Sequence, residues 1–333
     1  MAIFKNNLEK SIFATLAYFD VFDYPLTLFE IWKWLYQNED LKSTDSIANI
    51  EKTLENSEAL ESLISSKWGF YFLNGRKEIV KLRQEKYNLA EEKFKKALRI
   101  GRLLRFIPHI KMIAVCNSLA WSNPRKEGDL DFFIVTSKNK IWTVRFWATS
   151  FLKLFGLRPT KNKTRDKICL SFFVDEENFD LEPLALGEDI YLLYWIIQIV
   201  PVYDKDGIYQ KFLKANEWIK KYLPNSFGSE VSERRKVLSR APIPGIIASP
   251  DEIGTKQSYV SINERDCFGV ACPCNDCGEK FFRWIQMKVM PSKLKEMANR
   301  DSRVITSDGI LKFHDNDRRA EFKKKWEEKL LNC

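Results

Sequence analysis

The sequence predicts an α+β protein of more than one domain, and three patterns lead to that prediction. Helical apolar spacing and a hairpin-like segment fill residues 1–76. A long basic helix, predicted over 77–107, leads into apolar runs that alternate with helical patterns over 108–224. The last region, 281–333, is mainly helical. With 333 residues, 45% of them hydrophobic, the chain can give each part a core.

The first 76 residues are predicted to form three short helices followed by a β-hairpin. Helices are expected over 8–19, after Thr27 and from Asp45 to Asn56, and Glu30 completes a capping-box pattern with Thr27. The segment LISSKWGFYFLNG alternates around a turn, which predicts the hairpin. This outline is winged-helix-like, a form used for nucleic-acid binding or for packing and dimerisation. The third helix is acidic, which favours packing over contact with DNA phosphates.

Residues 108–224 are predicted to form the α/β core. The segments IKMIAV, LDFFIVT and ICLSFFV are expected as strands, with KIWTVRFWATSFLKLFGL as a helix after the second strand. Two further helices are expected over EDIYLLYWIIQIV and GIYQKFLKANEWIKKYL. The stretch 225–280 is rich in Ser, Pro and Gly at first and reads as a linker.

Two carboxylates at the head of the second core strand are the most informative feature for function. Asp129 and Asp131 are separated by one residue in EGDLDFFIVT, and alternate strand residues point to the same face. The buried run that follows would hold both carboxylates rigidly. Two such oxygen ligands, together with substrate phosphates, suit Mg²⁺. The alternative is a solvated turn that carries two aspartates.

The pattern Asn117-Ser118, a ten-residue spacer and Asp129-Leu130-Asp131 resembles the polymerase β-type nucleotidyltransferase superfamily. The resemblance covers roughly residues 108–180 and implies a mixed-sheet nucleotidyltransferase core. It implies that the two aspartates hold two Mg²⁺ ions and that Asn117, Ser118 and nearby backbone amides bind the phosphates of a nucleoside triphosphate (NTP). Lys126 is a further candidate for phosphate contact.

The chain departs from the family pattern at two positions. Asn117 stands where the family has glycine, and asparagine tolerates the left-handed backbone better than most residues. The family's third carboxylate, which activates the attacking hydroxyl, is absent within CLSFFV, and Asp175 at the end of that strand is the nearest candidate. The leading hypothesis is Mg²⁺-dependent transfer of a nucleoside monophosphate from NTP to an unknown hydroxyl acceptor. The alternative is a nucleic-acid-binding regulator or nucleotide sensor with a degenerate core.

Four of the seven cysteines fall within eleven positions of the linker. Their spacing is C-x4-C-x-C-x2-C, which is no secreted disulfide framework. Close thiolates suggest a metal, with Zn²⁺ ahead of an iron–sulfur cluster, although the spacing matches neither standard pattern. Free or redox-active thiols in a surface loop are the alternative. The residues are Cys267, Cys272, Cys274 and Cys277.

The formal net charge of +9 favours an anionic partner, either a nucleotide or a nucleic acid. The first residues lack the order of a signal peptide. The longest apolar segment, Tyr191 to Val202, is far below the roughly 20 residues of a membrane span. A cytoplasmic protein without membrane contact is therefore expected, with no indication of its oligomeric state.

A polar cluster near the end of the chain has two interpretations. His314 follows a short apolar run and is surrounded by Asp315, Asp317, Arg318 and Arg319. This group would either close over the active site or cap the last helix with local salt bridges, and the cap is favoured.

Overall fold

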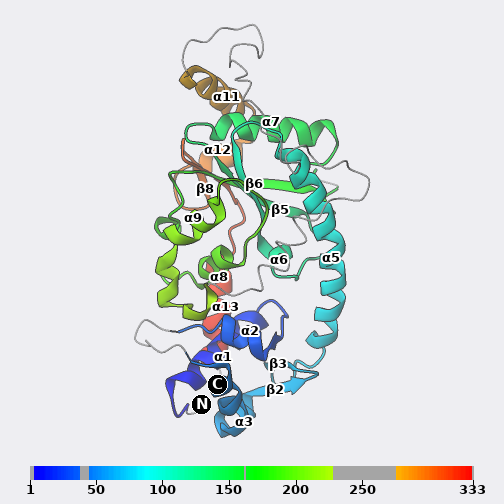
Figure 1. Cartoon of the computed structure of the whole chain (residues 1–333), viewed down its shortest axis with the longest axis vertical. Coiled ribbons are helices and arrows are strands. Elements are labelled where there is room, and N and C mark those ends of the chain that lie inside the picture. The colour runs from blue at the N-terminus through cyan, green and yellow to red at the C-terminus, as the bar shows by residue number, and fades with distance from the viewer. Residues whose placement is uncertain (1–3, 38–44, 161–162, 228–274, 332–333) are drawn as a thin grey trace, which may run out of the picture.

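The computed structural model describes residues 4–37, 45–160, 163–227 and 275–331 (Figure 1). It is a mixed α/β structure with a small sheet near the N-terminus, a larger mixed sheet and a C-terminal region that is mainly helical. No helix in these ranges is both long enough and apolar enough to cross a membrane.

The N-terminal part has the three helices and the hairpin that the sequence predicts, together with an additional short helix and an additional short strand. Thr27 and Glu30 form the expected capping box at the start of the second helix. The hairpin turns at Trp68 and Gly69, both with positive φ. The additional strand pairs with the hairpin in the order β1-β3-β2. The elements are α1 (Asn7–Asp20), β1 (Leu26–Thr27), α2 (Leu28–Lys33), α3 (Ile47–Asn56), α4 (Glu58–Leu63), β2 (Ile64–Lys67) and β3 (Phe70–Leu73).

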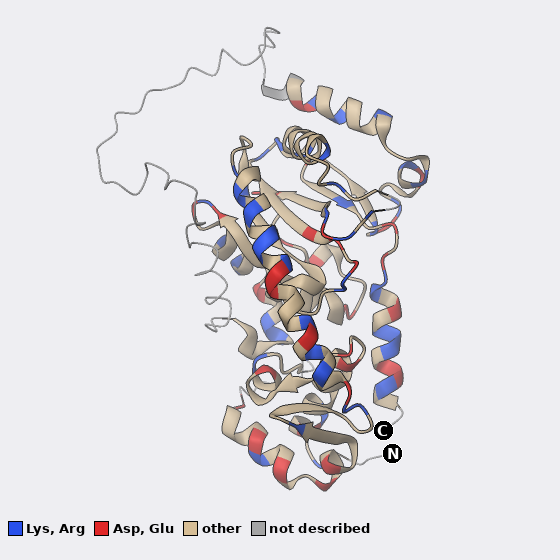
Figure 2. Ribbon diagram, turned by 90° about the vertical axis from the view of Figure 1, so that its right-hand side faces the viewer, with Lys and Arg blue, Asp and Glu red and all other residues tan. Residues whose placement is uncertain are grey.

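The predicted basic helix is α5 (Ile79–Leu104), which runs along one side of the molecule from the small sheet to the large one (Figure 1). Figure 2 shows Lys and Arg along the length of this helix, with acidic residues among them only up to its middle. Its buried face includes Phe94 and Leu98, which belong to the core under the large sheet. Near its start, Arg83 forms an ion pair with Glu30 at 2.7 Å and so connects α5 to the capping box of α2.

The large sheet has the strand order β7-β4-β5-β6-β9-β8. The pair β5–β6 is parallel and the other neighbouring pairs are antiparallel. Three of these strands match the predicted ones. The strands β7, β8 and β9 were not predicted, and β8 and β9 lie in the region that was expected to be mainly helical. The strands are β4 (Ile110–Val115), β5 (Leu130–Thr136), β6 (Ile168–Asp175), β7 (Val200–Asp204), β8 (Val304–Thr306) and β9 (Ile310–Phe313).

Two hydrophobic cores lie on the two faces of this sheet. The helices α5 and α7 cover one face. The other face packs against α8 and α9, and this core continues without interruption into α1 and α2 of the N-terminal part. The remaining helices are α6 (Asn117–Ala120), α7 (Ile141–Leu154), α8 (Ile190–Gln198), α9 (Ile208–Ala215), α11 (Asn275–Val289), α12 (Ser292–Met297) and α13 (Arg319–Leu331), with single turns of 3₁₀-helix at Glu182–Leu184, Glu217–Lys221 and Pro224–Ser226.

The predicted zinc site cannot be compared with the structure. Cys267, Cys272 and Cys274 lie outside the described residues, and so does the side chain of Cys277.

Candidate metal and nucleotide site

Asp129, Asp131 and Cys169 come together at one end of the large sheet. Each offers one ligand atom, and these three atoms all lie within 4.8 Å of one another. The reason is strand register: Asp131 and Cys169 are the second residues of β5 and β6, which are parallel, and the two residues pair directly. Asp129 immediately precedes β5. The structure therefore brings together the predicted aspartate pair and a thiol that the sequence did not single out.

The backbone at Asp131 is fixed by hydrogen bonds from both sides. The Cys116 N–H, directly after β4, donates to the Asp131 carbonyl at 3.1 Å. On the other side, the Leu130 N–H donates to the Lys167 carbonyl at 2.8 Å, and the Leu130 side chain is fully buried. These contacts hold the carboxylate in a rigid frame, as a metal or phosphate site requires.

Burial and like charge govern the protonation of this site. Burial first, and then the neighbouring Asp129, raise the pKa of Asp131 well above its usual range. Burial, followed by the two aspartates, raises the pKa of the Cys169 thiol to about 12. The thiol is therefore protonated at neutral pH. A cation between these groups would relieve the repulsion of the two carboxylates.

Arg158, from the segment before β6, brings positive charge to the same end of the sheet. Its guanidinium donates to the Ile168 carbonyl at 3.2 Å. Burial lowers the pKa of Arg158, while Cys169 and Asp129 oppose that shift, so the arginine lies within electrostatic reach of both. It is thus a candidate for contact with an anionic substrate at this site.

Asn117 connects the aspartate pair to helix α8. Its backbone is left-handed, with φ of +55°, a conformation that asparagine tolerates better than most residues. Its Oδ1 accepts hydrogen bonds from Trp195 Nε1 at 2.8 Å and from the Tyr191 hydroxyl at 3.4 Å. The amide nitrogen is then free to donate to Asp131, and this hydrogen bond opposes the rise in the Asp131 pKa.

The other predicted phosphate contacts lie nearby in the chain but are less firmly held. Ser118 follows Asn117 in α6 and is half-buried, and its carbonyl accepts from the Asn123 N–H at 2.8 Å. The helix α6 has only four residues. Lys126 is exposed in the loop that precedes Asp129.

Asp175 does not join the site. It pairs with Thr136 at the opposite end of the parallel strands, six residues along β6 from Cys169. Its carboxylate is buried and accepts hydrogen bonds from the Glu177 N–H at 3.0 Å and from Asn178 Nδ2 at 2.6 Å. Asp175 therefore stabilises a turn, and the expected third position beside the pair is held by Cys169.

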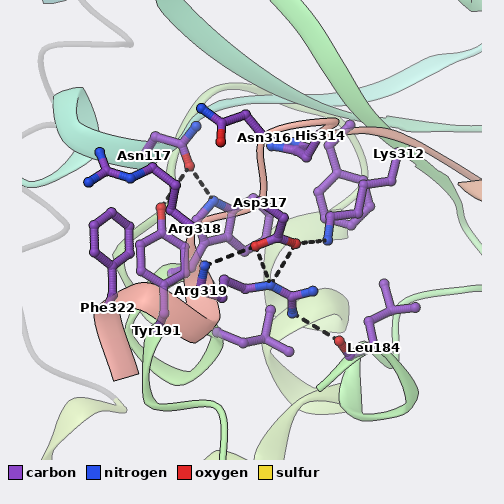
Figure 3. Close-up of a pocket in the computed structure, with 13 residues that line it drawn as sticks. Asn117, Leu184, Tyr191, Lys312, His314, Asn316, Asp317, Arg318, Arg319 and Phe322 are labelled. Atoms are coloured by element: carbon purple, nitrogen blue, oxygen red, sulfur yellow. Dashed lines mark hydrogen bonds and ion pairs between the residues drawn. The ribbon is translucent and has the colours of Figure 1, made fainter. Parts of the chain in front are cut away.

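A pocket of about 200 Å³ adjoins Asn117 (Figure 3). Its walls come from α8, β6 and the segment between β9 and α13, and its floor is an ion-pair network. Arg319 pairs with Asp189 at 2.7 Å and with Asp317 at 2.9 Å, and Lys312 pairs with Asp317 at 3.2 Å. The local salt bridges that one interpretation of the polar cluster expected are present at the start of α13, and Asp317 also lines the pocket.

Four residues of this region were missed as site residues by sequence reasoning. Cys169 carried a signal, since it occupies the same position in its strand as Asp131 does. Tyr191 and Trp195 were predicted only to belong to an apolar helix, with no role at the site. Lys312 lay in a segment without a clear period.

No model of a known family, no curated protein and no solved structure matches this chain. The function is therefore inferred from the geometry of the site itself.

Proposed function

We propose that this protein binds a nucleoside triphosphate with a divalent metal at Asp129 and Asp131 and transfers its nucleoside monophosphate to a hydroxyl acceptor. The observation that supports this is the convergence of Asp129, Asp131 and Cys169, with ligand atoms within 4.8 Å of one another. The motif around Asn117 and Ser118, which resembles that of the nucleotidyltransferases, gives the reaction class.

The donor atoms fit a hard divalent cation at the pair of aspartates. Two carboxylate oxygens with substrate phosphates are the ligands that Mg²⁺ prefers. Burial and the neighbouring Asp129 carboxylate raise the pKa of Asp131, and a cation bound between the two carboxylates would oppose that rise. When bound, the metal would neutralise charge on the phosphates and orient the group that is transferred.

The roles of the surrounding residues follow from their contacts. Asn117 orients the Asp131 carboxylate through its amide and is itself held by Trp195. Arg158 supplies positive charge near Asp129 for an anionic substrate. Ser118 and Lys126 are proposed to contact the phosphates.

A second function, nucleotide binding without turnover, is favoured by one specific observation. The third position beside the aspartates holds the Cys169 thiol, where the resemblance implies a carboxylate that activates the attacking hydroxyl. A carboxylate would accept the proton of that hydroxyl. In this case the protein is a nucleotide sensor or regulator with a degenerate transferase core.

The first experiment measures transfer of label from each α-labelled NTP, with Mg²⁺ or Mn²⁺, to cellular RNA and protein. Transfer is expected with the unmodified protein and is lost in Asp129→Asn and Asp131→Asn. Asp206→Asn is the matched control, because Asp206 is exposed, has positive φ and lies on the loop after β7. Transfer that survives both site substitutions would refute the proposal.

The second experiment separates the two functions through Cys169→Asp, with Cys169→Ser as the control of similar size. If the unmodified protein binds NTP without transfer and Cys169→Asp transfers label, the native protein is a sensor. If the unmodified protein transfers label and Cys169→Ser does so equally, the thiol is not needed as a proton acceptor. Absence of NTP binding in all of these proteins would exclude both functions.

A further inference from the structure

The pocket beside Asn117 has walls of aromatic rings. The ring of Phe172 lies 5.3 Å from that of Trp195 at an angle of 31°, and both line the cavity. On another wall, Tyr191 stacks on Phe322 with ring centroids 5.5 Å apart. Flat aromatic surfaces of this kind suit a planar ring as ligand.

The charges at the floor of the pocket cancel one another. Lys312 and Arg319 carry two positive charges, and their partners Asp189 and Asp317 carry two negative charges. All four side chains are largely buried, and each is already paired. Arg318, which also lines the pocket, pairs with Glu321 at 2.7 Å. Each cation of the lining therefore already has a carboxylate partner, and a neutral ring is the better fit.

Two polar groups of the pocket have no hydrogen-bond partner for their side chains among the described residues. They are the imidazole of His314 and the amide of Asn316, which are labelled in Figure 3. Burial lowers the pKa of His314 to about 4, so at neutral pH its ring offers one donor and one acceptor. Asn316 also offers both kinds of group. A ligand with donors and acceptors on its edge would satisfy them.

The volume of the pocket limits what can enter. At about 200 Å³ it is smaller than the 300–1,000 Å³ that is usual for a whole drug-sized ligand. One ring system fits and a complete nucleotide does not. Because Asn117 contacts Asp131 and also lines the pocket, a ligand with its ring here would extend toward the proposed metal site.

We propose that this pocket binds a nucleobase, with the ring against the aromatic walls and its polar edge hydrogen-bonded to His314 and Asn316. This inference rests on the proposed function, since it names the part of the substrate that the pocket recognises. The base belongs either to the NTP or to the acceptor, and both sources share this chemistry.

The test is equilibrium binding of the four ribonucleosides to the full chain by calorimetry, without metal. Nucleosides lack phosphate, so their binding depends on the base and sugar alone. We expect the protein to bind at least one nucleoside and to discriminate among the bases. His314→Phe, which keeps a ring of similar size, is expected to weaken binding about three- to tenfold, the effect of one lost hydrogen bond. Asn316→Ala, in an exposed position, is expected to weaken it in the same direction.

The control is His109→Asn, at the other histidine of the chain, where the backbone φ of +69° suits asparagine. Binding should be unchanged in that variant. The proposal that this pocket binds a nucleobase would be refuted if no nucleoside bound. It would also be refuted if His314→Phe, Asn316→Ala and the unmodified protein bound equally well. If nucleosides bind but no label is transferred, the proposal for the pocket stands and the proposed catalysis is rejected. Competition between a nucleoside and its triphosphate assigns the base to the NTP, whereas simultaneous binding assigns it to the acceptor.

Discussion

Asn117 combines an unfavourable backbone with favourable side-chain contacts. A left-handed φ costs an ordinary residue roughly 1 kcal/mol, and glycine and asparagine avoid most of that cost. The side chain of Asn117 accepts hydrogen bonds from Trp195 and Tyr191 and donates to Asp131. The residue therefore serves both the turn and the orientation of the carboxylate.

These two roles can be separated by substitution. Asn117→Gly keeps the backbone conformation and loses the hydrogen bonds, and we expect it to destabilise the protein by about 1–2 kcal/mol. Asn117→Ala loses the hydrogen bonds and also disfavours the left-handed backbone, so it should lower the free energy of unfolding by about 1 kcal/mol more than Asn117→Gly does. Urea unfolding of the two variants measures the difference. Equal stabilities would show that the positive φ carries no cost at this position.

The lowered pKa of His314 predicts that the free energy of unfolding depends on pH in a specific way. Burial and the positive charges of Lys312 and Arg319 lower its pKa to about 4, while Asp317 and Asp315 act in the opposite direction. Because the unfolded histidine titrates near 6.5, the unfolded state takes up the proton first as the pH falls. Stability is therefore complete above about pH 6.5 and decreases toward pH 4, by up to about 3 kcal/mol from this group.

His314→Phe removes the titrating group and should reduce this loss. The measurement is the free energy of unfolding between pH 7 and pH 4 for His314→Phe, His109→Asn and the unmodified protein. The difference between the first variant and the other two isolates His314 from the carboxylates that titrate in the same range. Parallel curves for all three proteins would contradict the prediction.

At the level of single residues, the sequence was sufficient to find the aspartate pair and the left-handed turn. Both features depend on residues that are close together in the sequence, so their spacing can be recognised without a structure. Cys169 was not foreseen, because its proximity to Asp131 depends on how β5 and β6 align across a connection of about thirty residues that contains α7. Asp175 was chosen as the nearest acid in sequence, but the register carries it to the far end of the strand.

Among the elements, Gly101 in α5 shows how closely this helix packs on the sheet. A Cβ at this position would lie 2.7 Å from Val202 Cγ2 in β7, which is shorter than normal contact. Alanine improves helix propensity by about 1 kcal/mol, but forced overpacking usually costs about 1–3 kcal/mol. Gly101→Ala should therefore give a net destabilisation of about 1 kcal/mol.

A double-mutant cycle tests this explanation. In a Val202→Ala background the clash is absent, so Gly101→Ala should become neutral or stabilising. Thermal unfolding of the four proteins gives the coupling. The same cost of Gly101→Ala in both backgrounds would mean that Val202 is not the obstacle.

The elements that the sequence predicted are those with a clear local pattern. The capping box of Thr27 and Glu30, the hairpin and the three strands with continuous apolar runs are present as expected. The strand β7 was read as the end of a helix, since its apolar residues continue those of α8. Pro201 interrupts the helix there, and pairing with β4 decides the conformation. The strands β8 and β9 likewise depend on a distant partner, β6.

For the molecule as a whole, the N-terminal part and the large sheet share one hydrophobic core. Residues of α1 and of α8 belong to the same buried cluster, and α13 adds Trp326 to it. The Trp326 Nε1 donates to the Ala14 carbonyl at 2.9 Å, and the indole ring is almost fully buried. These parts are therefore expected to unfold together.

Substitution of Trp326 tests this cooperativity. Trp326→Ala should cost about 3–5 kcal/mol, and Trp326→Phe, which keeps a ring but loses the hydrogen bond, should cost less. In each variant, urea transitions followed by far-ultraviolet and near-ultraviolet circular dichroism should coincide. Two separate transitions would show that the N-terminal part and the sheet are independent folding units.

The position of β9 and α13 late in the chain has a consequence during synthesis. Every donor of the proposed metal site lies before residue 170, but the pocket is completed only by Lys312, His314 and Phe322. Ribosomes add about 5–20 residues per second, so roughly 8–30 s separate translation of Cys169 from translation of Phe322. During that interval the aspartate pair and Cys169 have been made, but the residues that complete the pocket have not. The wall formed by β9 and α13 is thus added after the strands β4 to β7 of the sheet have been translated.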